Sequence, residues 1–394
     1  MLGRKKIKFT RAELFFYLGY FLYSLSIVVI GNSYLFGTDR FVIANVVSYL
    51  AAALLLVSFC FQKHKMRELF FRVIIGLFVF FVGLRIHSVG TGVIALLMMA
   101  SEKIKFERIV KLCVYCNLLF LFIVITSSLM GFIPNQTFYH NGLTAYGFGF
   151  AYFSNVPFSV FLITIMAYWL AKTGKRENLV LFLSLPANLF CYKYGTVRLT
   201  FFCYIIFIVL VIISKIINLT KNRKWYDVVV SVMYPIVAIF TIAISLIKNR
   251  FPIIQTLDVL LNYRLSFNLQ GIHRYGISLL GHKIENVAEY WDENYINHYF
   301  FIDCGYVSTL LNYGIVLFVI ILFLYSFLSH YAVRSQDSKL LILCVIICIF
   351  SVVNNVLFSM SSNPLTLIAF NLLRLLYKQR KTGNSEIPGR IMDL

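Results

Sequence analysis

The stretch LFFRVIIGLFVFFVGLRIHSVGTGVIALLMMA, residues 69–100, decides how many times this chain crosses a bilayer. It is too long for one straight membrane helix, which takes about 20 apolar residues, and short for two. If it forms two spans, 69–84 and 88–100, the basic segment SEKIKFERIVK (residues 101–111) falls on the same side as the other basic loops. Because basic loops of membrane proteins stay in the cytoplasm, we predict two short spans that meet near Arg85.

The rest of the chain has the composition of a membrane protein. Of its 394 residues, 60% are hydrophobic and 13% are charged, whereas soluble domains average about 25% charged residues. Apolar runs recur from end to end, which predicts an all-α, polytopic integral membrane protein of one domain, residues 1–394. Twelve spans are expected, at residues 13–31, 40–61, 69–84, 88–100, 110–133, 149–171, 178–192, 198–218, 226–247, 304–329, 340–360 and 364–377.

The net charge of +20 is explained by topology rather than by nucleic acid. With twelve spans, 27 of the 36 Lys and Arg residues fall on one side, where they orient the protein. They lie in the N-tail, in residues 62–72, 101–111, 172–176, 215–224 and 330–339, and in the C-tail. We therefore expect a multi-pass protein of the cytoplasmic membrane with both termini in the cytoplasm and no nucleic-acid partner.

The other nine cations lie on the outer side, where the orientation rule does not explain them: Arg40, Arg85, Lys193, Arg198, Lys248, Arg250, Arg264, Arg274 and Lys283. Five of them belong to one large extracellular loop, residues 248–303, in which LNYRLSFNLQGIHRYGISLLGHK (residues 261–283) carries no acid. Apolar residues at helical spacing from Ile253 to Leu265 predict a helix at the membrane surface. The segment GISLLGHK has glycines around an apolar turn and predicts a turn-bounded segment.

Clustered arginines at the outer leaflet suit a phosphate or pyrophosphate group, because the guanidinium fork matches phosphate oxygens in a bidentate way. The alternative is that these cations pair with outer acids or reach lipid head groups, and pairing is favoured for Arg40, Lys248 and Lys283. His282 could take a proton from a sugar hydroxyl. No metal-binding motif, P-loop or cofactor motif occurs, so an activated substrate would have to supply the energy of a reaction.

At this point the sequence resembles a known family. NYRLSFN…RYGISLLGH (residues 262–282) and FFIDCGYVSTLLNYGIVLF (residues 300–318) are similar to the large outer loop and the following span of Wzy-type polysaccharide polymerases of Gram-positive bacteria. YGFGFAYFSN (residues 146–155) and YGTVRLTFF (residues 194–202) also resemble landmarks of that family. The resemblance implies a metal-independent glycosyltransferase that uses no cofactor. It would transfer an oligosaccharide from undecaprenyl pyrophosphate to a sugar hydroxyl of the next lipid-linked unit.

The resemblance also implies roles for particular residues. Arg264 fills the arginine of N-x-R-L, Asp303 the acidic position and Tyr306 the aromatic position before the next span. Arg264, His282 and Asp303 are the expected catalytic residues. Binding of pyrophosphate or glycan is expected from Arg85, Arg198, Arg250, Arg274 and Tyr306. The chain departs from the pattern at Cys304, where many members have Asn, and at Asn354 and Asn355, where many members carry an acid. An Asn pair in a span can also serve helix–helix hydrogen bonding.

Two other functions remain open on the sequence. An O-antigen-ligase-like glycan transferase would share this architecture and chemistry. A lipid-linked oligosaccharide flippase would show two similar halves and charged residues at mid-span, which the sequence lacks. Under the polymerase hypothesis the partners are the bilayer, the lipid-linked oligosaccharide, and the flippase and chain-length regulator of the same pathway.

Overall fold

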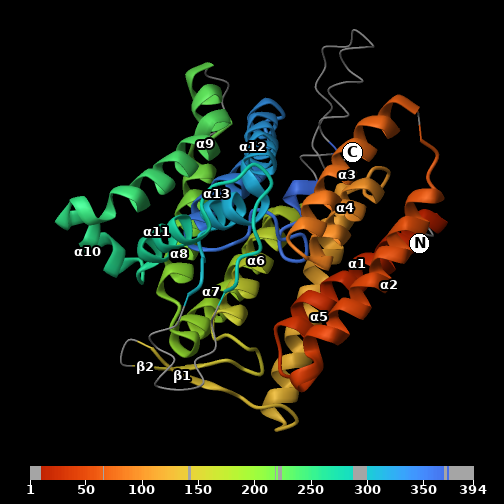
Figure 1. The fold of residues 1–394 in the computed structure, drawn as a ribbon. Helices are drawn as coiled ribbons and strands as arrows, with labels where there is room; N and C mark the ends of the chain where they lie inside the picture. The colour runs from red at the N-terminus through yellow and green to blue at the C-terminus, as the bar shows by residue number, and fades with distance from the viewer. Residues whose placement is uncertain are drawn as a thin grey trace.

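A computed structural model describes residues 10–64, 66–140, 143–217, 219–220, 224–286, 300–367 and 371. Within these residues the fold is helical apart from one short β-hairpin, β1 (Thr137–His140) and β2 (Leu143–Tyr146) (Figure 1). The helices are α1 (Arg11–Ser24), η1 (Leu25–Gly31), η2 (Gly37–Asp39), α2 (Arg40–Cys60), α3 (Met66–Arg85), α4 (Val89–Ala100), α5 (Phe106–Leu129), α6 (Asn155–Leu170), α7 (Gly174–Gly195), α8 (Arg198–Ile216), α9 (Lys224–Ile247), η3 (Lys248–Arg250), α10 (Pro252–Leu260), α11 (Arg264–Tyr275), α12 (Gly305–Arg334) and α13 (Ser338–Val353). The all-α class is therefore confirmed.

Six helices of the described residues have the length and hydropathy of a membrane span. They are Arg11–Gly31, Arg40–Cys60, Phe106–Leu129, Arg198–Ile216, Asp227–Arg250 and Gly305–Arg334, and two shorter apolar helices are Asn155–Leu170 and Ser338–Val353. Large apolar side chains on the outer faces of these helices are exposed, among them Phe41 (60% exposed) and Phe240 (62% exposed). Such surfaces are typical of helices that face lipid, and the chain is described below as an α-helical membrane protein.

The stretch 69–100 folds as two helices, α3 and α4, as the sequence predicts. The chain reverses at residues 86–88, where His87 takes a left-handed conformation (φ 53°) and the Ser88 hydroxyl accepts a hydrogen bond from the Thr91 backbone. A Cβ on Gly83 would lie 3.1 Å from the backbone nitrogen of Gly92, so the two helices approach closely. The four N-terminal helices pack together on one side of the molecule (Figure 1).

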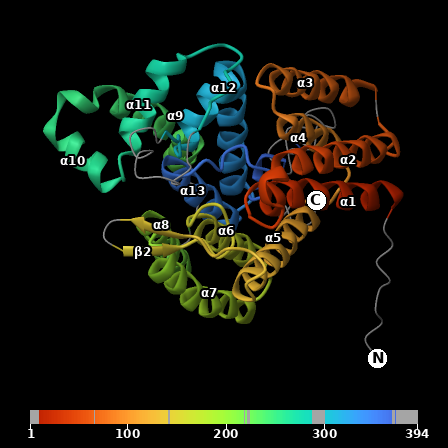
Figure 2. The same cartoon turned by 60° about the horizontal axis from the view of Figure 1, so that its bottom comes forward.

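Helices α12 and α13 occupy the middle of the molecule, between the N-terminal helices and α9–α11 (Figure 2). Helix α12 is broken at Gly314, which has φ 80° and ψ 169°. The predicted turn GISLLGHK fills this break: the Ile315 backbone donates to the Ser278 carbonyl at 2.9 Å, and the His282 backbone donates to the Leu311 carbonyl at 2.9 Å. The turn thereby satisfies polar groups that the break would leave exposed.

The outer segment after α9 differs in detail from the expected single surface helix. It forms two helices, α10 and α11, because Asn262 (φ 55°) and Tyr263 (φ 59°) are both left-handed and end the first helix. Apolar spacing alone does not reveal such a break, since Leu265 continues the pattern of α10 from within α11. Most of the acidic segment ENVAEYWDENY (residues 285–295) lies outside the described residues.

A second difference concerns the eleventh expected span, residues 340–360. Helix α13 ends at Val353, and the chain then runs without regular structure through the interior to Pro364. The Tyr20 hydroxyl donates to the Met360 carbonyl at 2.8 Å, and the Asn117 side chain donates to the Ser361 carbonyl at 2.8 Å. Because both partners stand in the middle of long helices, this irregular segment lies deep in the bundle. Of the twelfth expected span, 364–377, only 364–367 and 371 are described.

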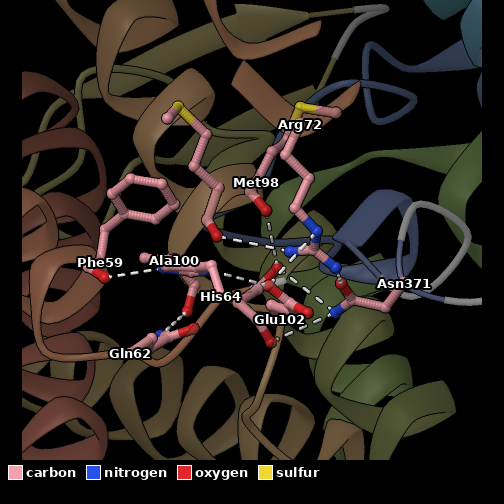
Figure 3. Close-up of polar contacts among 10 residues, drawn as sticks. Phe59, Gln62, His64, Arg72, Met98, Ala100, Glu102 and Asn371 are labelled. Atoms are coloured by element: carbon pink, nitrogen blue, oxygen red, sulfur yellow. Dashed lines mark hydrogen bonds and ion pairs between the residues drawn. The ribbon is translucent and has the colours of Figure 1, made fainter. Parts of the chain in front are cut away.

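A buried polar cluster joins the ends of α2, α3 and α4 (Figure 3). Glu102, whose side chain is 1% exposed, pairs with His64 at 3.1 Å and with Arg72 at 3.5 Å. Asn371 accepts from Arg72 and donates to Ser101, and so brings a late segment of the chain to the cluster. Arg72 is therefore more than the orienting loop cation that the charge pattern predicts.

Further ion pairs join loops that the charge pattern assigns to the same side of the membrane. Arg108 pairs with Glu13 at 2.5 Å, Lys172 with Glu107 at 3.0 Å, Lys339 with Glu177 at 2.5 Å and Arg334 with Asp227 at 2.9 Å. Tyr34, in the loop between η1 and α2, bonds Gly149 and Gln136 of the segment between α5 and α6. The contacts between loops therefore form two separate groups.

Candidate functional site

A cavity of ≈ 680 Å³ opens where the irregular segment after α13 meets α6, the α7–α8 turn and the start of α11. Amide and hydroxyl side chains alternate with aromatic ones around it. Its polar lining includes Asn32, Asn117, Asn155, Thr196, Asn354 and Ser362, and its aromatic lining includes Phe153, Phe158, Tyr263 and Phe301. Among the described residues of this lining, Arg264 and Asp303 are the two that carry a formal charge.

Arg264 and Asp303 form an ion pair at the N-terminal end of α11. The Nη2 atom of Arg264 lies 3.3 Å from Oδ2 of Asp303, and the two side chains are 10% and 26% exposed. These are two of the three residues expected to be catalytic, and they come from segments about 40 positions apart along the chain. The ion pair leaves two other guanidinium nitrogens of Arg264, Nε and Nη1, buried with no hydrogen-bond partner among the described residues.

The position of Arg264 is fixed by a buried aspartate on the preceding helix. Asp258, 1% exposed, accepts from the backbone N–H groups of Leu265 (2.8 Å) and Ser266 (3.2 Å) and from the Ser266 hydroxyl (2.5 Å). It thus caps the N-terminus of α11 from seven residues upstream, where a carboxylate also favours the positive end of the helix dipole. Lys248 pairs with Asp258 at 3.1 Å, so its expected pairing with an outer acid is found.

Two consecutive left-handed residues, Asn262 and Tyr263, stand directly before Arg264. Asparagine tolerates this conformation, but a tyrosine in it is strained. Hydrogen bonds from the Asn262 backbone to the Val259 carbonyl (3.1 Å) and from the Tyr263 backbone to the Asp258 carbonyl (2.8 Å) hold the turn closed. Strained backbone of this kind gathers at functional sites, because the surrounding contacts must hold it in place.

The carboxyl of Asp303 has a shifted pKa. Burial raises the pKa of its carboxyl above the ordinary aspartate value, while the nearby Arg264 guanidinium opposes part of that rise. A raised pKa makes a carboxylate a better proton acceptor near neutral pH. The segment is anchored on the other side by Gly305, whose added Cβ would lie only 2.7 Å from the Asn354 carbonyl.

The other expected site residues lie away from the cavity lining. His282 belongs to the turn that fills the break in α12, and its backbone bonds Leu311. Arg85, the last residue of α3, holds this turn from outside, with its Nε donating to the Gly281 carbonyl at 3.3 Å. Tyr306 is fully buried and its hydroxyl donates to the Cys348 carbonyl at 2.9 Å, so it ties α12 to α13. These contacts give His282, Arg85 and Tyr306 positions in the scaffold around the cavity.

The remaining expected cations are on the surface. Arg198 is exposed at the start of α8, and Arg250 is exposed in η3. Arg274 lies with its guanidinium carbon 5.4 Å from the ring centre of Tyr275 and 5.6 Å from that of Phe300. The structure therefore brings Arg264 and Asp303 into the cavity and leaves these three arginines outside its lining.

The sequence argument missed several cavity residues. Asn155, Thr196 and Asn354 line the cavity, and each has a buried polar side-chain atom without a partner among the described residues. Signals for two of them were present: the Asn pair in SVVNN (residues 351–355) and the position of Thr196 in the predicted break between spans. Asn155 ends the stretch YGFGFAYFSN (residues 146–155), which resembles a family landmark, but the residue type alone did not mark it, because an Asn beside a helix start usually caps the helix.

The arrangement combines one buried cation, one carboxylate with a raised pKa and a neutral wall of amides, hydroxyls and aromatic rings. Among the described residues no group of three His, Cys, Asp or Glu side chains is placed to hold a metal ion. Comparison with protein-family models, curated proteins and solved structures gives no match to this chain. The site is therefore interpreted from its own geometry and chemistry.

Proposed function

We propose that this protein is a membrane glycosyltransferase that polymerises lipid-linked oligosaccharide repeat units. The donor is a glycan on undecaprenyl pyrophosphate at the outer face of the cytoplasmic membrane, and the acceptor is a sugar hydroxyl of another lipid-linked unit. The observation that carries the proposal is the buried Arg264, which is paired with Asp303 through one nitrogen and has two more nitrogens unpartnered beside the cavity.

A diphosphate is the ligand that best matches these free nitrogens. Buried donors without acceptors are costly, and an arginine beside a polar cavity is suited to bind anionic oxygens in a bidentate way. The same cavity offers neutral amide and hydroxyl groups for sugar hydroxyls and aromatic rings for the C–H faces of sugar rings. A lipid-facing exterior would let the polyprenyl chain remain in the bilayer while its head group enters the site.

The reaction is a single displacement. Asp303 accepts the proton of the acceptor hydroxyl as its oxygen bonds to the anomeric carbon of the donor sugar. The bond between that carbon and the pyrophosphate oxygen breaks, and its electron pair stays on the leaving group. Arg264 stabilises the charge that develops there, as preorganised donors do in other transfer reactions. The attack inverts the anomeric carbon, and the proton on Asp303 passes to water or to the released polyprenyl diphosphate.

The topology that accompanies this proposal has both termini in the cytoplasm and the Lys248–Asp303 segment outside, with α13 and the irregular segment after it entering the bundle in place of a full eleventh span. The two groups of loop contacts described above support it, because each contact joins segments on the same predicted side. Arg264 and Asp303 then face the leaflet in which extracellular glycan assembly takes place.

The proposal is tested by glycan analysis in a strain that lacks the gene. We expect single lipid-linked repeat units in that strain and a ladder of polymer lengths after complementation with wild-type protein. Arg264→Ala, expressed to the same level, restores no ladder, whereas the exposed Arg250→Ala serves as the matched control and restores it. Full ladders that stay on the lipid carrier in the deletion strain would identify a ligase, and units trapped inside would identify a flippase.

A further inference from the structure

The part of the cavity wall that follows the end of α13 is formed by backbone without regular secondary structure. Asn354, Ser361 and Ser362 line the cavity in the irregular segment that follows Val353. Side chains from behind hold this segment in place, with Asn363 donating to the Val356 carbonyl (2.9 Å) and Tyr325 donating to the Leu357 carbonyl (3.0 Å). Irregular backbone at membrane depth is tolerated where it is buried in protein or lines a polar cavity.

Three neutral side chains of the lining have unmet hydrogen bonds. Thr196 and Asn354 are 7% and 8% exposed, and the Thr196 hydroxyl and the Asn354 amide nitrogen have no partner among the described residues. The amide nitrogen of Asn155 is buried and unpartnered in the same way. They come from three different elements, the start of α6, the α7–α8 turn and the end of α13, yet all line one cavity. Buried polar groups are usually satisfied, so several unmet ones around one space indicate a ligand.

The chemistry of this wall favours a sugar over a second phosphate. Amides and hydroxyls can both donate and accept, as sugar hydroxyls can, and none of the three carries the charge that a phosphate would need. Thr196 is left-handed (φ 52°), a costly conformation for a β-branched residue, as expected where a side chain must be aimed. The backbone of Asn354 packs next to the segment that carries Asp303, because a Cβ on Gly305, two residues after Asp303, would lie 2.7 Å from the Asn354 backbone oxygen.

We propose that Asn155, Thr196 and Asn354 form a neutral subsite that binds hydroxyls of the acceptor sugar and orients one of them toward Asp303. This inference rests on the proposed glycosyl transfer. Under this proposal the cavity has a charged part, where Arg264 binds the diphosphate of the donor, and an uncharged part, which binds the acceptor.

The subsite is tested with purified full-length protein in detergent and two separate probes. One probe is the free repeat-unit oligosaccharide, released by mild acid from the lipid-linked units of the deletion strain, and the other is polyprenyl diphosphate without sugar. Asn354→Leu and, independently, Thr196→Val weaken oligosaccharide binding at least tenfold and raise the KM for this acceptor. Both variants bind polyprenyl diphosphate within twofold of wild type.

The matched control is Asn188→Leu, since Asn188 is also a buried asparagine but lies within α7 and bonds Thr164 and Ser184 outside the cavity. It leaves oligosaccharide affinity unchanged wherever the variant folds. Thr196→Val keeps the shape and β-branching of the side chain, so it remains informative if Asn354→Leu does not fold. Unchanged oligosaccharide affinity in both variants would show that the wall binds only water and would overturn the subsite.

Loss of polyprenyl diphosphate binding in the same variants would instead assign the wall to the donor. Failure of the proposed function looks different, because wild-type protein would then bind the oligosaccharide without joining it to lipid-linked units. In that case the direct binding comparison between wild type and the two variants still decides whether the subsite exists.

Discussion

Removal of the Asp258 carboxylate should release the start of α11 and with it Arg264. In Asp258→Ala, two backbone N–H groups and the Ser266 hydroxyl lose their acceptor. At about 1 kcal/mol for each net hydrogen bond the loss is about 3 kcal/mol. Loss of the pair with Lys248 adds to this, because the Lys248 side chain is only 18% exposed and is left without its carboxylate. Since 1.4 kcal/mol is a factor of ten, local opening of this turn should rise on the order of 100-fold.

The assay is amide hydrogen exchange of purified protein in detergent, followed by mass spectrometry of peptides that cover Arg264–Tyr275. Lys248→Met removes the ion pair and keeps the cap, so its exchange should rise less than tenfold. Asp258→Asn keeps an oxygen that can accept the two N–H groups and should lie between wild type and Asp258→Ala. Exchange in Asp258→Ala within threefold of wild type would refute the role of Asp258 in positioning Arg264.

Three further predictions concern the scaffold and the base. In Gly281→Ala the new Cβ would lie 2.0 Å from the Asn312 carbonyl oxygen, whereas at Gly276, also left-handed, it meets nothing within 4 Å. Thermal unfolding should therefore show that Gly276→Ala lowers the free energy of unfolding by about 1 kcal/mol, from backbone strain. Gly281→Ala should lower it by much more. Equal losses in the two variants would contradict the packing of the turn GISLLGHK into the break in α12. Glu102→Ala should destabilise the protein by about 3–5 kcal/mol, because Arg72 stays buried without its carboxylate. Glu177→Ala is the control, since its partner Lys339 is 24% exposed, and it should cost about 1 kcal/mol or less. The raised pKa of Asp303 means that the folded state binds more protons than the unfolded state above pH 3.8, the ordinary aspartate value. As pH rises through that window, stability from this group should fall while the transfer rate rises, and Asp303→Asn should abolish both slopes; a rate profile unchanged by Asp303→Asn would remove Asp303 as the base.

The sequence predicts the helices well because hydrophobic runs and loop charges are local signals. The split of residues 69–100 follows from the charge of a loop, and the break at KYGTVR (residues 193–198) follows from its polar residues. The early end of α13 does not follow from the sequence in this way. The residues after Val353 mix Asn and Ser with apolar side chains, and hydrogen bonds from Tyr20, Asn117 and Tyr325, all distant in sequence, hold them without regular structure.

For the site, chemistry was easier to predict than position. Arg264 and Asp303 were chosen because of their types and their resemblance to a family pattern, and the structure places both in the cavity. Arg274 and His282 follow Arg264 closely in sequence, but Arg274 lies at the far end of α11 and His282 lies in the turn that packs into the break in α12. The uncharged residues Asn155 and Thr196 lie in stretches that the sequence marks, but their place in the cavity follows only from their unmet hydrogen bonds in three dimensions.

The most direct test of the central claim is glycosyl transfer by purified protein in liposomes. Lipid-linked repeat units from the deletion strain are the substrate, and polymer and free polyprenyl diphosphate are measured together. We predict one polyprenyl diphosphate released for each new linkage with wild-type protein, and a rate lowered by about 10²–10³ in Arg264→Ala, the loss expected when a preorganised donor to the leaving group is removed. Polymer formed by Arg264→Ala at the wild-type rate would contradict the claim, as would wild-type protein that leaves the units unlinked.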